Sequence, residues 1–245
     1  MRINRRIDAK IVRPITKSGE AKKSKSASMP PKTPELANLI LDRLYERNPI
    51  LSLTCQMAAL TGLRYSDASW LKYDDFYNAK GEFLESFEIC QQKTFSMRVG
   101  RKDKPMSQDE AFRKSLVTVY TNAEIEDIVK ETRLFSKGSE FLFANPRSRI
   151  VQDDGTVIDR PMSVESADWH HDRVSKELNL DWTLGTHSWR KYFAKRLVKM
   201  GATVEEIRDL LGQSSLASTN AYLISIEEDL KAHVKKLTLE AAELQ

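Results

Sequence analysis

Apolar side chains recur at helical spacing over most of this 245-residue chain. The stretch LSLTCQMAALTGL, residues 51 to 63, is apolar on nearly every side, so we expect it to form a buried central helix. Further helices are predicted at residues 34 to 46, 123 to 134, 163 to 178, 186 to 201, 203 to 212 and 226 to 243.

Residues at several predicted helix ends are of types that favour a boundary. Thr33 can cap the first helix, with Pro34 at its first position. Ser66 or Asp67 is expected to cap a helix that follows the central one. Further N-caps are predicted at Asn122 and at Thr203, which forms a capping box with Glu206.

Two segments alternate between apolar and polar residues, which indicates strands. They are FLESFEIC (83 to 90) and SLVTVY (115 to 120). The polar stretch between them predicts a hairpin connection, with Lys93 at its tip, and FLFANP (141 to 146) is a further short strand or extended piece. The fold class is therefore α+β, mostly helical, with a small antiparallel sheet.

Basic residues concentrate at the N-terminus. Residues 1 to 32 carry ten Lys or Arg and two acids, a net charge of +8, and the whole chain carries +4, so the remainder carries about −4. Because residues 16 to 32 are also rich in Lys, Ser and Pro, we interpret residues 1 to 32 as a disordered basic tail and residues 33 to 245 as the folded domain. Such a tail can bind nucleic acid phosphates, or it can simply keep the protein soluble.

The composition argues against several classes of protein. No apolar run approaches the roughly 20 residues that span a bilayer, and the chain opens without the apolar stretch of a signal peptide. Cys55 and Cys90 lie in apolar contexts without metal-ligand spacing, so we expect reduced core thiols, no metal and a cytoplasmic location.

Two stretches carry basic residues where an anion is favoured. In TGLRYSD, Arg64 directly follows the predicted buried helix, where a guanidinium needs an anion or a carboxylate such as Asp67. In THSWRKYFAKR, His187 and Arg190 share a face in the first turn of a helix, which favours bound anions. The alternative for the second stretch is a solvated basic face.

Two further stretches add groups that transfer protons or attack phosphorus. Lys93 in QQKT is either an ordinary hairpin lysine or a general acid, with Lys102 and Lys104 nearby. Tyr222, at the end of LGQSSLASTNAYL, is either a core residue or a nucleophile. Taken together, the four stretches indicate a phosphate site in which arginines replace a metal ion.

These stretches resemble the tyrosine recombinase (phage integrase) family over about residues 34 to 240. The resemblance implies the catalytic-domain fold of that family, with Arg64 and Arg190 holding the scissile phosphate. Lys93 is implied as general acid for the leaving 5′ oxygen. His187 would assist proton transfer to and from Tyr222, which would form a 3′-phosphotyrosyl bond.

The resemblance also implies supporting residues and two departures. Asp67 matches the acid that buttresses the site, and Lys191 and Lys195 extend the basic helix as DNA contacts. Gln213 stands where the family usually has His or Trp; its amide can still donate a hydrogen bond but carries no charge. Only about 33 residues precede the first helix, as in minimal recombinases without a separate core-binding domain.

The function implied is site-specific DNA recombination without metal, ATP or other cofactor. The expected partners are double-stranded DNA, a homo-tetramer joined by exchange of the C-terminal helix (about 226 to 245), and accessory DNA-bending proteins at the nucleoid. The alternatives are a catalytically weakened DNA-binding accessory protein of the same fold and a type IB topoisomerase.

Overall fold

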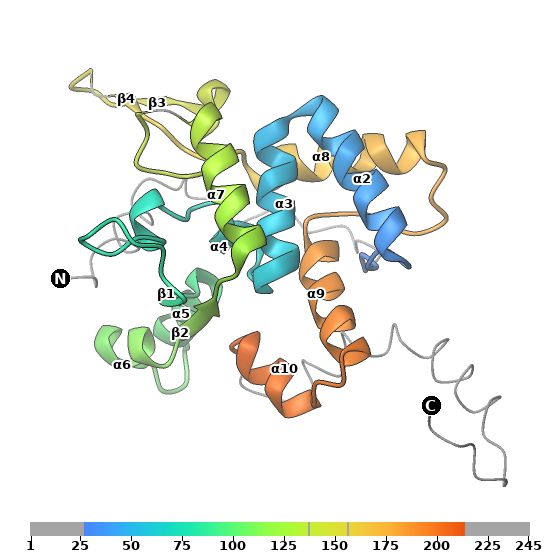
Figure 1. Ribbon diagram of the computed structural model, residues 1–245. Helices are drawn as coiled ribbons and strands as arrows, with labels where there is room; N and C mark the ends of the chain where they lie inside the picture. The colour runs from blue at the N-terminus through green and yellow to red at the C-terminus, as the bar shows by residue number, and fades with distance from the viewer. Residues whose placement is uncertain (1–26, 137, 156, 214–245) are drawn as a thin grey trace, which may run out of the picture.

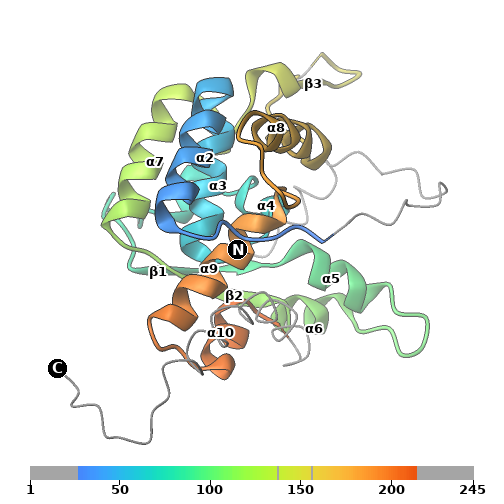
Figure 2. The same cartoon turned by 90° about the vertical axis from the view of Figure 1, so that its right-hand side faces the viewer.

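The fold is built around one buried helix, as the sequence predicts. In this computed structural model, which describes residues 27–136, 138–155 and 157–213, α3 (Pro49–Thr61) lies at the centre of the molecule (Figure 1). Three long helices pack against α3, and a fourth packs against α2. They are α2 (Pro34–Arg47), α7 (Ala123–Phe135), α9 (His187–Lys199) and α8 (Val164–Glu177), and Figure 2 shows the same arrangement from the side.

A single residue, Asn48, separates the first two helices of this core. Its backbone N–H donates to the Leu44 carbonyl at the end of α2, and its side-chain oxygen accepts from the Leu51 N–H at the start of α3. Pro49 then opens α3, at a position where no N–H is needed. The predicted caps Thr33, Asn122 and Thr203 are also confirmed.

The two predicted strands are confirmed as an antiparallel pair. β1 (Ser86–Cys90) pairs with β2 (Leu116–Tyr120), so that Cys90 lies opposite Leu116. The alternating residues Phe87, Ile89, Val117 and Val119 are buried in the main core. This burial explains the period of two in the sequence and confirms the α+β class with a small sheet.

The connection between these strands is not the simple hairpin that the sequence predicts. It forms two helices, α5 (Gln92–Val99) and α6 (Gln108–Arg113), which pack on each other. Phe95 and Ala111 bury their side chains beside Cys90, so the segment has a small core of its own. Lys93 therefore lies in the first turn of α5 and not at a hairpin tip.

The predicted cap after the central helix is also wrong. The short helix α4 (Tyr65–Ala68) begins after Arg64 and has no side-chain cap. Asp67 is fully buried, and its Oδ1 accepts a hydrogen bond from the backbone N–H of Gln92 at 3.1 Å. The Asp67 carboxylate therefore binds a backbone group that is distant in sequence and does not cap the helix.

The remaining elements are short. The polypeptide forms 3-10 turns at Tyr73–Asp75 and Pro146–Ser148, and a two-residue hairpin of β3 (Ile150–Val151) and β4 (Val157–Ile158). After α9, the helix α10 (Val204–Leu210) lies beside β2. Among the described residues no helix has the length and apolar character needed to cross a membrane. Both cysteines are buried and free.

Part of the tail predicted to be disordered packs against the domain. The Met29 N–H donates to the Thr183 carbonyl at 2.9 Å, and Lys191 Nζ donates to the Ser28 carbonyl at 2.6 Å. Lys195 Nζ reaches the Lys32 carbonyl at 3.2 Å. Figure 2 shows this blue segment passing the start of α9. Residues 1–26 of the predicted tail lie outside the described residues.

Candidate active site

Arg190 lies where the ends of three helices meet. It projects from α9 and is fully buried. Its Nη1 donates to the Gly62 carbonyl at 2.6 Å, and its Nη2 donates to the Leu211 carbonyl at 2.8 Å. Gly62 ends α3 and Leu211 ends α10, so both carbonyls lie at helix C-termini, whose partial negative charge favours a cation.

Arg64 lies at the start of α4 with an extended backbone conformation. Its Nη1 donates to Gln91 Oε1 at 2.6 Å and lies 3.9 Å from Asp67 Oδ2. The side chain keeps 15% of its surface exposed. Asp67 is thus placed between Arg64 and the backbone of α5, where it supports the arginine without facing solvent.

Gln91 connects the two arginines. While its Oε1 accepts from Arg64, its Nε2 donates to the Leu211 carbonyl at 2.9 Å, the same oxygen that Arg190 uses. Gln91 is almost completely buried, at 1% exposure. Gln91 is the first residue of the QQKT motif, and its position directly after a buried strand is the one sign in the sequence of a structural role.

His187 and Lys93 complete the cluster from two further helix starts. His187 opens α9 and Lys93 lies in the first turn of α5, and both side chains are exposed. The surrounding protein partly desolvates His187 and lowers its pKa below 6.5, and the positive charges of Lys93, Arg190 and Arg64 lower it further. His187 is therefore neutral at pH 7 and able to accept a proton.

A second set of buried hydrogen bonds holds the start of α9 against α8. Trp189 Nε1 donates to His171 Nε2 at 2.8 Å, which places the ring proton on Nδ1, where it donates to the Ala167 carbonyl at 2.7 Å. The Thr186 N–H donates to Asp168 Oδ1 at 3.0 Å. These bonds tie the first turn of α9 to α8, and periodicity gave no sign of them because the residues look like ordinary amphipathic positions.

Burial of His171 predicts an acid-sensitive fold. Burial lowers the pKa of His171 from 6.5 to about 4. Between these values the unfolded chain binds a proton that the native state excludes, so stability is full above pH 6.5 and falls as the pH falls toward 4. We expect a loss of up to roughly 3 kcal/mol in the free energy of unfolding from this group.

Urea unfolding at pH 7 and pH 4.5 measures this loss. His171→Gln is the matched variant, because an amide can make both hydrogen bonds but does not titrate. A pH dependence as steep in His171→Gln as in the wild type would show that other groups cause it.

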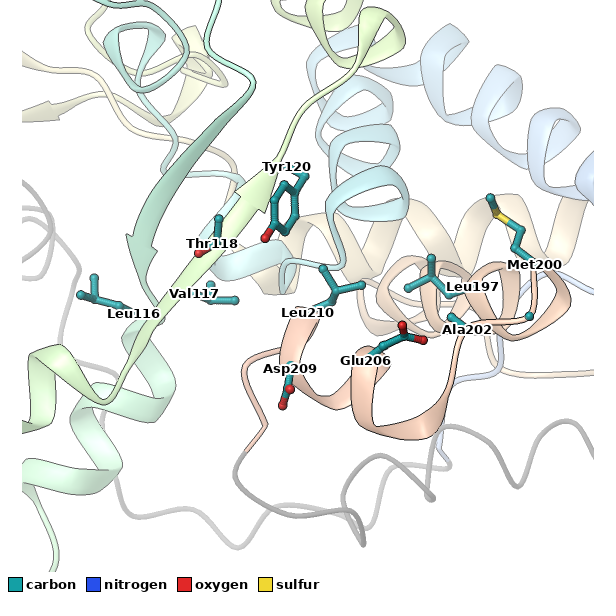
Figure 3. Close-up of a pocket in the computed structure, with 11 residues that line it drawn as sticks. Leu116, Val117, Thr118, Tyr120, Leu197, Met200, Ala202, Glu206, Asp209 and Leu210 are labelled. Atoms are coloured by element: carbon teal, nitrogen blue, oxygen red, sulfur yellow. The ribbon is translucent and has the colours of Figure 1, made fainter.

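A separate pocket of about 810 Å³ lies between β2, the end of α9 and α10. Figure 3 shows apolar side chains from all three elements facing it. Glu206 and Asp209 contribute carboxylates to the wall. The other lining residues are Leu116, Val117, Thr118, Tyr120, Leu197, Met200, Gly201, Ala202 and Leu210.

The structure brings together most of the residues that the sequence singled out. Arg64, Lys93, His187 and Arg190 converge from α4, α5 and α9. Gln213 lies two residues after Leu211 in the chain and is half-buried. Its backbone N–H donates to the Arg208 carbonyl at 3.0 Å. Tyr222 and the predicted helix at 226 to 245 lie outside the described residues.

Lys191 and Lys195 lie further along α9 and bind the segment before α2, as described above. Within the described residues, no group of three or more His, Cys, Asp or Glu side chains is placed to hold a metal ion.

Comparison with known proteins identifies the fold. Residues 36–228 match the model of the phage integrase family, and the chain therefore belongs to that family. Comparison with curated protein sequences gives no match.

Three solved structures illustrate the shared tyrosine recombinase catalytic-domain fold. The Tn1549 transposon integrase in complex with transposon right end DNA is 16% identical, with a TM-score of 0.54 over 86% of this chain and 68% of that chain. XerA recombinase is 14% identical, with a TM-score of 0.56 over 87% and 66%. A lambda integrase dimer bound to a COC′ core site is 17% identical, with a TM-score of 0.54 over 82% and 62%.

Proposed function

We propose that this protein is a site-specific DNA recombinase that cleaves and rejoins DNA through a 3′-phosphotyrosyl intermediate. The observation that carries the proposal is the linkage of Arg64 to Arg190 through the Gln91 side chain and the Leu211 carbonyl, with His187 and Lys93 beside them. Two fixed guanidinium groups are suited to the nonbridging oxygens of a phosphodiester. The family and the DNA-bound relatives support this substrate.

The chemistry assigns one step to each group. The Tyr222 oxygen attacks phosphorus, its proton passes to the neutral His187, and the bond from phosphorus to the 5′ oxygen breaks. Lys93 gives the departing 5′ oxygen its proton. The phosphotyrosyl bond conserves the energy of the diester, so a 5′ hydroxyl of another strand can reverse the step without ATP.

The charge of the transition state falls on the two arginines. Arg64 and Arg190 are always protonated, so they stabilise the developing negative charge without a metal ion. Gln213, two residues after Leu211, adds a neutral donor to the same place. We expect this neutral group to stabilise the transition state less than a cation, by on the order of 1 kcal/mol.

Covalent trapping tests the proposal directly. Labelled, nicked DNA from the regions flanking the gene is incubated with the protein and run on a denaturing gel. We expect a slow-migrating band that protease removes, and only with certain fragments. DNA binding without any adduct on every fragment contradicts the proposal and favours the alternative that Gln213 motivates, a DNA-binding accessory protein. Relaxation of any supercoiled plasmid without sequence preference would instead indicate a topoisomerase.

The same proposal assigns DNA contacts to two further lysines and places the protein at the nucleoid. Lys191 and Lys195 continue from the site along α9 and would add positive charge near the DNA backbone while they hold the segment before α2. DNA-bending proteins would act as accessory partners at the nucleoid.

A homo-tetramer on paired sites is the proposed assembly. The pocket beside α10 is lined by apolar side chains together with Glu206 and Asp209, and residues 226 to 245 carry an apolar row that would contact the apolar part. We infer that the pocket accepts this segment from a neighbouring copy.

Met200→Glu tests this assembly. Met200 lines the pocket and is 75% exposed, so the change should leave folding within about 0.5 kcal/mol of the wild type. We expect DNA-assembled multimers to fall about tenfold, because the change removes an apolar contact and adds a third carboxylate to a pocket that already holds Glu206 and Asp209. Native gels with DNA that carries one or two recombination sites measure the fraction of protein in multimers. Met97→Glu, also exposed but on α5, is the control, and equal losses in both variants would refute the pocket.

A further inference from the structure

We propose that Gln91 is a positioning residue for strand transfer: it holds the Arg64 guanidinium in place and ties it to the C-terminal end of α10. The inference rests on the proposed recombinase function for its consequence in catalysis, but the positioning itself is a property of the free protein. No motif of the sequence assigns Gln91 this role.

The partners of Gln91 fix its orientation completely. Arg64 offers only donors, so the amide must turn its oxygen toward Nη1, at 2.6 Å. The Leu211 carbonyl offers only an acceptor, so the amide must turn its nitrogen that way, at 2.9 Å. Thr94 Oγ1 donates to the same oxygen at 3.2 Å. A buried amide held at both ends has one rotamer and one flip state, which makes it a rigid spacer.

The end of α10 is shaped to receive this amide. Gly212 adopts a left-handed backbone conformation with φ of 61°, and a Cβ there would lie 3.1 Å from Gln91 Nε2. The absent side chain therefore leaves room for the amide against the helix end. Because Leu211 also accepts from Arg190, any displacement of this helix end moves or breaks its bond to Arg190 and its bond to Gln91, the amide that holds Arg64.

A neutral amide suits this position better than a carboxylate. Gln91 orients Arg64 without neutralising it, so the full positive charge stays available for a phosphate. Asp67 is the nearby carboxylate, and it lies 3.9 Å from Arg64 Nη1 while its other oxygen is held by the Gln92 N–H. The segment that follows α10 carries Gln213 and then Tyr222, so Gln91 links the phosphate clamp to the part of the chain that bears the proposed nucleophile.

Chemical modification of the free protein tests the positioning. Phenylglyoxal modifies accessible guanidinium groups, and mass spectrometry reads the rate at Arg64. We expect Gln91→Met to raise this rate by about fivefold or more, because the hydrogen bond that restrains Nη1 is lost. Gln92→Met is the matched control, since that side chain bonds Ser96 and not an arginine. An unchanged Arg64 rate in Gln91→Met, with both variants folded by thermal melting, overturns the proposal.

Strand transfer tests the consequence. We expect Gln91→Met to bind site DNA as the wild type does and to form the covalent adduct about 10- to 100-fold more slowly. On DNA whose scissile phosphate is replaced by a methylphosphonate, the difference should shrink to within about threefold, because one of the two charged nonbridging oxygens is missing and the reaction depends less on Arg64. An equal loss on both DNAs would indicate a general structural defect and overturn the proposal.

Gln91→Glu tests the bond to the Leu211 carbonyl apart from the bond to Arg64. It keeps the acceptor for Arg64 but places a carboxylate against the Leu211 carbonyl, so we expect slow Arg64 modification together with slow adduct formation. Wild-type adduct formation by Gln91→Glu overturns the tie to α10. A wild-type protein that forms no adduct on any DNA refutes the proposed function, and the modification rate at Arg64 still decides the positioning.

Discussion

Tyr222→Phe is expected to bind site DNA within about twofold of the wild type and to form no covalent adduct. The change removes one oxygen and keeps the ring, so contacts that depend on shape persist. Without that oxygen no bond to phosphorus can form, and none of the other clustered groups replaces it: Arg64 and Arg190 stay protonated, and the remaining groups serve in proton transfer.

The measurement pairs a native gel for binding with a denaturing gel for the adduct. Tyr45→Phe is the control, because Tyr45 lies on α2, where its hydroxyl bonds Glu131, and loses the same oxygen away from the site and the pocket. Adduct retained in Tyr222→Phe would assign the nucleophile to another residue. Loss of the adduct in Tyr45→Phe as well would show that the assay reports a general weakening.

The elements with a strong local signal could be predicted from the sequence. Pro49–Thr61 forms the central helix because its apolar residues leave no solvent face, and the residues of β1 and β2 alternate because one side of each strand is buried. Thr33 and Asn122 cap helices through bonds to residues only three positions away. Such features are local, so a sequence contains them.

The connection between the strands could not be placed this way. Its polar residues resemble a hairpin loop, but Phe95 and Ala111 find burial against Cys90 across a distance that periodicity does not report. As a result Lys93 lies in the first turn of a helix. It still comes close to His187, as the family resemblance implies, but from a helix and not from a hairpin tip. Tertiary burial overrode the weak local preference here.

The residues that hold the site are the least visible in the sequence. Gln91, His171 and Trp189 make contacts between positions 18 to 120 residues apart, and each looks unremarkable in its own segment. The residue types that do chemistry were recognisable because arginine and histidine are costly to place near a core without a purpose. Their supporting partners become identifiable only when the helices are brought together.

Arg190→Ala is expected to damage both stability and strand transfer. The substitution leaves the buried Gly62 carbonyl without its donor and opens a cavity at a fully buried position, so we expect a loss of roughly 2–4 kcal/mol in the free energy of unfolding. The Leu211 carbonyl keeps Gln91, which limits the loss. Removal of one arginine from the clamp should slow adduct formation by at least about 10²- to 10³-fold.

Arg190→Met separates these two effects. Methionine refills much of the volume and removes the buried charge, and replacing a buried ionic group by an apolar one of similar size often costs little. We therefore expect urea unfolding to show Arg190→Met well above Arg190→Ala in stability, while adduct formation stays as low in both. If adduct formation recovers together with stability, Arg190 acts by holding α3, α9 and α10 together and not through its charge at the phosphate. If stability recovers alone, the guanidinium that joins the three helix ends is also the group that the reaction needs.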